Sequence, residues 1–172
     1  MKKILTMGLI LALCLCGCGE TVTDDLEKFT WGMTRDEVME TKGSQPDETT
    51  TEERELIYKG EKRYGLPCDV SYWITPDEGL FSVYYIYSKN YEDVNDYKSD
   101  FEKVSQQLRS ELGEPRLTWD SSDEERVSSD TDGLMDGVIL YENWHLGETS
   151  INHSVTDFES RGLTHSVYYM AP

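Results

Sequence analysis

The sequence has few basic residues, little cysteine and no apolar run long enough to cross a bilayer as a helix. Among 172 residues, 16 are Lys or Arg and 34 are Asp or Glu, so the formal net charge is −18. This negative charge repels the phosphates of nucleic acids, and we therefore expect no nucleic-acid partner. The acidic side chains are expected to keep a tethered domain in solution, or to attract a basic partner.

Cysteine occurs four times, at Cys14, Cys16, Cys18 and Cys68. We expect the first two to be removed with an N-terminal segment and the Cys18 thiol to be modified, so only the Cys68 thiol remains and neither an internal disulfide nor a Cys-based metal site can form. Cys68 stands in an alternating apolar run beside Val70. We interpret it as a small buried hydrophobe rather than a reactive thiol.

The longest apolar run, from Ile4 to Leu15, follows the basic pair Lys2 and Lys3. It is shorter than the roughly 20 residues that a membrane-spanning helix needs. Its length and its basic start are those of a secretory signal peptide, for which we assign residues 1–17.

The letters at the end of this run, Leu15-Cys16-Gly17-Cys18, resemble the lipobox of bacterial lipoproteins. The resemblance implies cleavage before Cys18 and lipidation of its thiol, with palmitate-type acyl chains that hold the protein on a membrane. An ordinary secretory signal with a chance cysteine is the alternative. We expect residues 18–28 to form the lipidated cysteine and its tether, and the protein to be extracytoplasmic, on the cell membrane or on an outer membrane if one exists.

Two helices are predicted in the remaining chain. The first begins at Thr34, which forms a capping box with Glu37, and it ends at Gly43 before Pro46. The second runs from about residue 92 to 112. Its apolar residues recur every three or four positions, at Val94, Tyr97, Phe101, Val104, Leu108 and Leu112.

Strand-like runs follow each helix, at 55–59, 68–75 and 80–88, and then at 138–146, 149–155 and 164–170, with a possible short strand at 116–119. Residues 45–53 and 120–137 are predicted to be loops. The last strand of each half shares its letters: Ser82-Val83-Tyr84-Tyr85 and Ser166-Val167-Tyr168-Tyr169. The predicted fold class is therefore α+β, with two α-β-β-β repeats (29–90 and 91–172) in one compact domain, helices packed on one face of an antiparallel sheet, and a lipoprotein signal peptide before them.

A family resemblance begins at Phe29-Thr30-Trp31-Gly32-Met33-Thr34 and continues through Glu37-Val38, Gly43 and Pro46. This stretch resembles the opening motif of the SmpA/OmlA (BamE-like) lipoproteins, in which a short helix packs on a small antiparallel sheet. A tandem pair of such units resembles the β-lactamase inhibitor protein fold, in which two repeats build one concave sheet. BamE-like domains are single units that work in outer-membrane barrel assembly, so their role does not transfer safely to a double unit.

Alternation along the strands separates an inward from an outward set of side chains. The inward set is predicted to be Cys68, Val70, Tyr72, Ile74, Phe81, Val83, Tyr85, Tyr87, Val138, Leu140, Trp144, Leu146, Val167 and Tyr169. The outward set leaves aromatic residues with polar tips, which protein interfaces favour. We predict a partner-binding face made of Trp73, Tyr84, Tyr141, His145 and Tyr168, although cross-strand aromatics can also simply stabilise a solvated sheet.

Other sites are less favoured by the sequence. His145, His153 and His165 could suggest zinc, but alternation places His145 and His153 on opposite faces. Within the 120–137 loop, Ser128-x-Asp130-x-Asp132-Gly133 resembles the start of an EF-hand calcium loop, yet Ile139 stands where a bidentate Glu belongs. A solvated loop is therefore favoured, with weak calcium binding as the alternative. We find no nucleophile or phosphate-binding motif.

The leading hypothesis is a lipoprotein of the cell envelope that acts as a non-catalytic binding or assembly module for an envelope protein. It requires no metal or cofactor. The alternatives are a proteinaceous inhibitor of a secreted hydrolase and, last, an envelope enzyme.

Overall fold

The computed structural model describes residues 28–50, 54–87, 89, 91, 94–121, 137–158 and 162–172. The signal peptide predicted at 1–17, the lipidation site at Cys18 and the tether up to residue 27 lie outside the described residues. Most of the loop predicted at 120–137 lies outside them as well, including the proposed calcium-loop start at Ser128.

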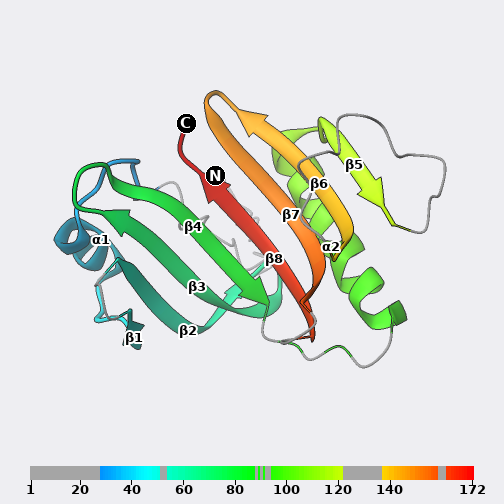
Figure 1. Ribbon diagram of the computed structural model, residues 1–172, viewed down its shortest axis with the longest axis horizontal. Helices are drawn as coiled ribbons and strands as arrows, with labels where there is room; N and C mark the ends of the chain where they lie inside the picture. Colours follow the sequence, from blue (N-terminus) through cyan, green and yellow to red (C-terminus); the bar gives the residue numbers. More distant parts are fainter. Residues whose placement is uncertain are drawn as a thin grey trace, which may run out of the picture.

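The described chain contains two helices and eight strands. In chain order they are α1 (Arg35–Lys42), β1 (Glu48–Thr49), β2 (Glu55–Arg63), β3 (Leu66–Thr75), β4 (Gly79–Tyr87), α2 (Val94–Leu112), β5 (Leu117–Asp120), β6 (Val138–Leu146), β7 (Thr149–Phe158) and β8 (Gly162–Met170). All strands belong to one antiparallel sheet in the order β1-β2-β3-β4-β8-β7-β6-β5. Figure 1 shows β4 and β8 side by side at its centre.

The predicted fold class of two α-β-β-β repeats with helices packed on a sheet is wrong. The fold is mostly a single eight-stranded sheet, and four strands, not three, follow each helix in the chain. Helix α1 is too short to form a covering layer, since it has eight residues and buries only Val38. The edge strand β1 was missed because Glu48 and Thr49 are exposed and carry no apolar signal.

The predicted start of the first helix is confirmed. The Thr34 hydroxyl accepts from the Glu37 amide at 3.4 Å, while the Glu37 carboxylate accepts from the Thr34 amide at 2.8 Å. The hydrogen bonds from the Thr34 backbone and side chain lower the pKa of Glu37. Gly43 ends the helix in the left-handed conformation with φ 73°.

Two of the predicted inward residues are not buried. Leu80 is buried in place of its neighbour Phe81, because the β3–β4 register shifts between Trp73 and Ile74. A bulge of this kind exchanges the two faces of the residues beyond it. Leu146 is 64% exposed because it ends β6 at the hairpin turn, beyond the core.

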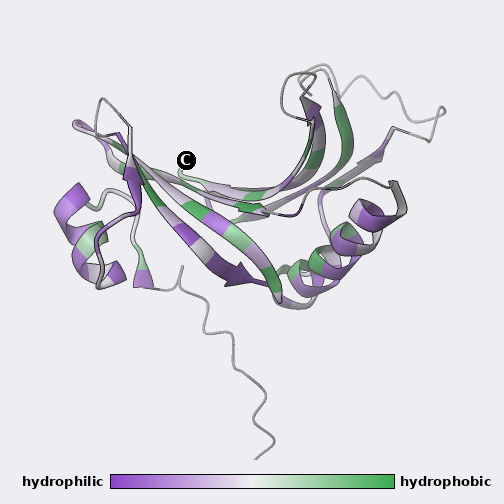
Figure 2. Cartoon of the chain, turned by 90° about the horizontal axis from the view of Figure 1, so that it is seen from below, coloured by the Kyte–Doolittle hydropathy of each residue, from purple (hydrophilic) through white to green (hydrophobic). Residues whose placement is uncertain are grey.

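Both helices lie on the same side of the sheet (Figure 2), which we call the helix side. On this side the strands contribute a row of buried aromatic and aliphatic residues, including Tyr72, Val83, Tyr169 and Trp144. From the helices, Val38, Val104 and Leu108 join the same core, each with no exposed surface. Cys68 is also fully buried here and is free, as expected for a small hydrophobe.

A buried arginine connects β2 to the centre of the sheet. The Arg63 guanidinium lies 4.6 Å from the ring centre of Tyr64 and 4.9 Å from that of Tyr85. Its Nη2 donates to the Tyr169 hydroxyl at 3.2 Å, and the Tyr64 hydroxyl donates to Glu111 of α2 at 2.9 Å. These contacts join β2, β4, β8 and α2. The buried guanidinium charge is stabilised by cation–π attraction to the tyrosine rings in place of hydration by water.

Residues 30–34, which we call the N-terminal strap, are attached to the β3–β4 turn. The Gly32 amide donates to the Leu80 carbonyl at 2.9 Å, and the Leu80 amide donates to the Met33 carbonyl at 2.7 Å. Trp31 reaches the other half of the sheet, where its Nε1 donates to Thr149 Oγ1 at 2.9 Å. Neither helix in the described ranges has the length and apolar character required to traverse a bilayer.

Candidate binding face

The sheet side opposite the helices, which we call the open face, carries the aromatic residues predicted from the sequence. The strand register arranges its side chains in rows that run across the strands. The central row pairs Tyr84 of β4 directly with Tyr168 of β8, and Tyr168 with Asn152 of β7. The four aromatic residues of the predicted face therefore share one side of the sheet.

The rings of the open face form a continuous contact series. Trp73 and Tyr84 have ring centres 6.3 Å apart, and Tyr84 and Tyr168 stack at 5.0 Å with an interplanar angle of 16°. The Tyr141 hydroxyl donates to Asn152 Oδ1, which also accepts from Asn143 Nδ2 at 2.9 Å. These interactions hold the rings in place before any ligand arrives, and rigid rings lose little conformational entropy on binding.

Most of the exposed large hydrophobic side chains of the described residues lie on the same face. Four large hydrophobic side chains are exposed, and three of them lie here: Trp73 at 37%, Ile86 at 40% and Met170 at 40%. Met170 pairs with Ser82, the cross-strand neighbour of Trp73, and Ile86 lies two residues beyond Tyr84 on β4. Clustered exposed apolar residues with polar neighbours are typical of a protein interaction site.

Burial raises the pKa of two tyrosines on this face. Half-buried in the sheet surface, Tyr168 has its pKa raised to about 12, mainly by burial and further by Tyr141 and Tyr84. Burial also raises the pKa of Tyr141, against the effect of its hydrogen-bonding neighbour Asn143. Both hydroxyls therefore stay protonated near neutral pH. The Tyr141 hydroxyl already donates to Asn152, so of the two only the Tyr168 hydroxyl can donate to a partner without giving up that bond.

His145 is placed differently from the other predicted site residues. It is exposed on the open face at the end of β6, where it pairs with Ser150. Three strands separate it from Trp73, and in the described residues no ring contact joins it to the aromatic series. The structure thus brings together Trp73, Tyr84, Tyr168 and Tyr141, and leaves His145 at the rim.

Several residues of this face were missed in the sequence. Ile86 and Met170 stand at outward positions of the same alternation, and their apolar character was the signal that could have included them. Trp119 of β5 pairs with Tyr141 and extends the aromatic face to the sheet edge. Asn143 and Asn152 could not be found, because their role depends on the pairing of β6 with β7.

The zinc alternative is not supported by the geometry. His145 lies on the open face, while His153 and His165 are fully buried on the helix side. Within the ranges that the structure describes, no group of three or more His, Cys, Asp or Glu residues is placed to hold a metal ion.

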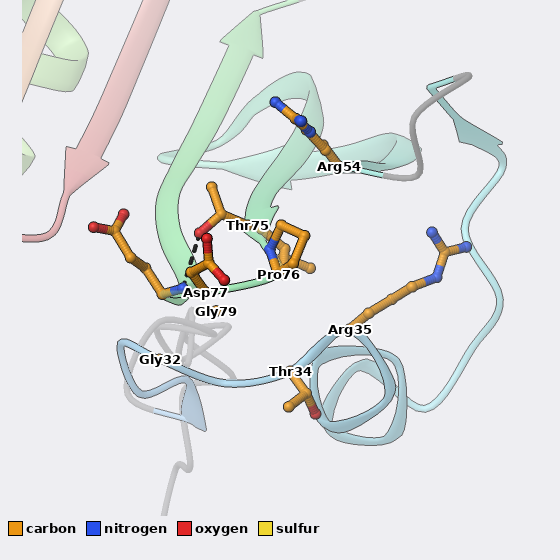
Figure 3. A pocket seen from close by; sticks show the side chains of 10 residues that line it. Gly32, Thr34, Arg35, Arg54, Thr75, Pro76, Asp77 and Gly79 are labelled. Carbon is orange, nitrogen blue, oxygen red and sulfur yellow. Dashed lines mark hydrogen bonds between the residues drawn. The ribbon is translucent and has the colours of Figure 1, made fainter.

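A hollow beside the N-terminal strap was not predicted (Figure 3). It has a volume of about 450 Å³ and lies where the strap and α1 meet the β3–β4 turn. Thr75 Oγ1 accepts from the Glu78 amide at 3.0 Å within the turn. Figure 3 shows that the guanidinium groups of Arg35 and Arg54 do not point toward one another, so they form no common anion site.

The comparisons with known proteins give little guidance. No family model matches the sequence, and no curated protein matches it. A similar solved structure is that of a DUF4309 family protein (YjgB) from Bacillus subtilis, with 12% sequence identity and a TM-score of 0.46 over 81% of this chain and 78% of that chain. A TM-score of this size carries no inference about function, and the resemblances to SmpA/OmlA lipoproteins and to the β-lactamase inhibitor protein stay predictions.

Proposed function

We propose that this protein is a membrane-anchored extracytoplasmic lipoprotein that acts as a non-catalytic binding module. Its partner-binding surface is the open face, centred on Trp73, Tyr84 and Tyr168. The observation that carries the proposal is the concentration of exposed apolar side chains around the stacked tyrosines. Cross-strand pairing alone would explain the stacking, but it gives no reason for exposed Ile86 and Met170 beside it.

The charge of the chain favours a basic protein as the partner. The net charge of −18 attracts a positively charged surface over distances of about a Debye length, roughly 8–10 Å in physiological salt. Indole and phenol rings then bind Lys or Arg side chains through their faces, as well as packing against aliphatic groups. An envelope protein with a basic and apolar patch therefore matches the face in both respects.

Anchoring would restrict where that partner is found. A lipid on Cys18 and the short tether up to residue 28 would keep the domain close to the bilayer. A membrane-associated partner would then meet it at high effective concentration. Replacement of Cys18 by Ser should abolish acylation and release the protein from membranes, measured by fractionation and mass spectrometry of the N-terminal peptide.

The proposal is tested with purified protein immobilised as bait for solubilised envelopes. The variant Trp73→Ala/Tyr84→Ala removes two rings of the face, and Leu146→Ala is the matched control because Leu146 is 64% exposed but lies at the β6–β7 turn. We expect the control to retain the captured protein and the double variant to lose it. With the isolated partner, calorimetry should show binding at least about thirtyfold weaker for the double variant.

Normal capture by Trp73→Ala/Tyr84→Ala would contradict the proposal. A loss of capture counts only if the double variant is fully folded in the absence of urea and unfolds in one cooperative transition. Both rings are partly exposed, so we expect the loss of stability to be modest, about 1–2 kcal/mol.

A further inference from the structure

A continuous hydrogen-bonded chain of titratable side chains runs through the core beneath α2. The Tyr91 hydroxyl lies 3.1 Å from His165 Nδ1, and His165 Nε2 lies 2.8 Å from His153 Nε2. His153 Nδ1 lies 3.2 Å from Glu142 Oε2. Glu142 Oε1 accepts from Ser105 Oγ at 2.9 Å and from Arg109 Nη2 at 2.6 Å.

The donor and acceptor inventory fixes the direction of this chain. Glu142 accepts hydrogen bonds from Ser105 and Arg109, so as a carboxylate it also accepts from His153 Nδ1, which must carry a proton. His153 Nε2 is then a lone pair in the neutral ring, and His165 Nε2 must donate to it. His165 Nδ1 in turn accepts from the Tyr91 hydroxyl, for which the Asp100 carboxylate of α2 competes as a second acceptor. With both histidines neutral, every contact in the chain has one donor and one acceptor.

The same geometry accommodates one additional proton but not two. If His153 gains a proton at Nε2, His165 can switch to its other tautomer, accept at Nε2 and donate from Nδ1 to Tyr91. A second proton leaves two N–H groups opposed at 2.8 Å and two imidazolium charges in one core. Both rings have no exposed surface, so water cannot relieve that repulsion.

The elements packed around His153 and His165 bring charged side chains and one aromatic ring close to the two imidazoles. Glu142 on β6 is the anion that favours one proton, and Arg109 on α2 opposes a second. Asp100 on α2 is paired with Lys89 at 2.9 Å, and Tyr87 on β4 presents its ring to His165 at 4.3 Å. Burial lowers the pKa of both histidines; Glu142 opposes this for His153, whereas the neighbouring His153 lowers that of His165 further.

Helix α2 is held to the sheet by the same groups. Phe101 stacks on His153 with ring centres 3.9 Å apart and an interplanar angle of 10°. Ser105 and Arg109, one and two turns further along the helix, bind the carboxylate that orients His153. A groove of about 260 Å³ between α2, β5 and β6 reaches Ser105, Arg109 and Glu142, and it gives protons a route from solvent.

We propose that His153 and His165 form an acid-sensitive latch that fixes α2 to the sheet near neutral pH and releases it when the pair takes up a second proton. In the unfolded or released state both rings titrate near the ordinary histidine pKa of about 6.5. Each histidine that the packed state keeps neutral makes packing about 25-fold less favourable between pH 7 and pH 5. The latch thus opens as the pH falls below about 6.5, not as it rises.

The test compares the pH dependence of urea unfolding for the parent, His165→Gln and His145→Gln. Glutamine at position 165 can still donate an amide N–H to His153 Nε2 but cannot be protonated. Between pH 7 and pH 5, we expect the unfolding equilibrium constant to rise about 25-fold less in His165→Gln than in the parent. His145→Gln, which removes an exposed histidine from the opposite face, should leave that loss unchanged. An unchanged loss in His165→Gln would overturn the proposal.

A second measurement on the parent protein keeps the proposal falsifiable if His165→Gln fails to fold. Nitrogen-15 shifts of the imidazole rings at pH 7 should show His153 protonated at Nδ1 and His165 protonated at Nε2. The protection factors of the amides in residues 97–109, which take account of the slower intrinsic exchange at lower pH, should fall as the pH falls from 6.5 to 5, before those in β3 and β4. The reverse tautomers, or stoichiometric zinc binding that requires both histidines, would show that the pair is not this latch.

Discussion

Replacing Gly79 by alanine should destabilise the fold far more than a single added methyl group suggests. Gly79 has φ 70°, and an added Cβ would lie 2.2 Å from the Gly32 carbonyl oxygen, which is closer than any real contact. Because the clashing atom belongs to the backbone of the N-terminal strap, a side-chain rotation cannot relieve it. Either the β3–β4 turn or the strap must move.

The magnitude follows from two costs. A non-glycine residue in the left-handed region costs roughly 1–2 kcal/mol. Moving the strap also stretches its two hydrogen bonds to Leu80, at 2.9 and 2.7 Å, which contribute about 0.5–1.5 kcal/mol each. We therefore expect Gly79→Ala to lower the free energy of unfolding by about 2–5 kcal/mol.

Gly147→Ala is the matched control, because Gly147 has φ 62° and nothing within 4 Å of an added Cβ. It should cost only the conformational part, about 1–2 kcal/mol. Urea titrations that give the same slope for both variants measure the difference directly. Equal losses for Gly79→Ala and Gly147→Ala would refute the claim that the strap is packed against this turn.

Three further predictions concern the helix side. Burial raises the pKa of Cys68 to about 12, so iodoacetamide at pH 8 should label it only after unfolding, as measured by mass spectrometry of its peptide. Arg63→Leu should lower the free energy of unfolding in urea by about 2–3 kcal/mol, because the Tyr64 and Tyr169 hydroxyls lose their donor. The control Lys62→Leu, at an exposed position, should lower it by less than about 0.5 kcal/mol. Burial raises the pKa of Glu142, but hydrogen bonds from its three partners outweigh this and lower it. Its stabilisation is therefore present above the ordinary pKa of about 4.3 and lost below it, and Glu142→Gln should cost about 3 kcal/mol at pH 7 and less as the pH falls below 4.

Local signals made some of the fold readable from the sequence. Thr34 and Glu37 lie one helical turn apart, so their mutual capping depends on nothing else in the chain. The apolar stripe of the second helix predicted its end at Leu112. The open face was readable for the same reason, since period-2 alternation places Tyr84 and Tyr168 each opposite to the apolar positions of its own strand, which face the core.

Long-range pairing was not readable, and it determines the architecture. The single sheet arises because β4 and β8 pair directly, although Tyr84 and Tyr168 are far apart in the chain. Their shared Ser-Val-Tyr-Tyr letters suggested equivalent positions but not neighbouring ones. The bulge near Phe81 was hidden for a similar reason, because a one-residue insertion shows only against its partner strand.

The buried His153–His165 contact illustrates the same limit. Alternation correctly separated His145 from His153, but it could not show that β7 and β8 would place His153 and His165 in hydrogen-bond contact. Nor could it show that Phe101 of α2 would stack on His153. Polar residues in an apolar pattern were the available signal, and their meaning required the register of three strands and a helix.

Site-specific photo-crosslinking in isolated envelopes tests the proposed binding face most directly. p-Benzoylphenylalanine placed at Tyr168, in the centre of the open face, is compared with the same group placed at Glu102, which is exposed on α2. The proposed function predicts that irradiation joins a discrete envelope protein to position 168 and none to position 102. Crosslinks from position 102 alone, or from neither position, would contradict it.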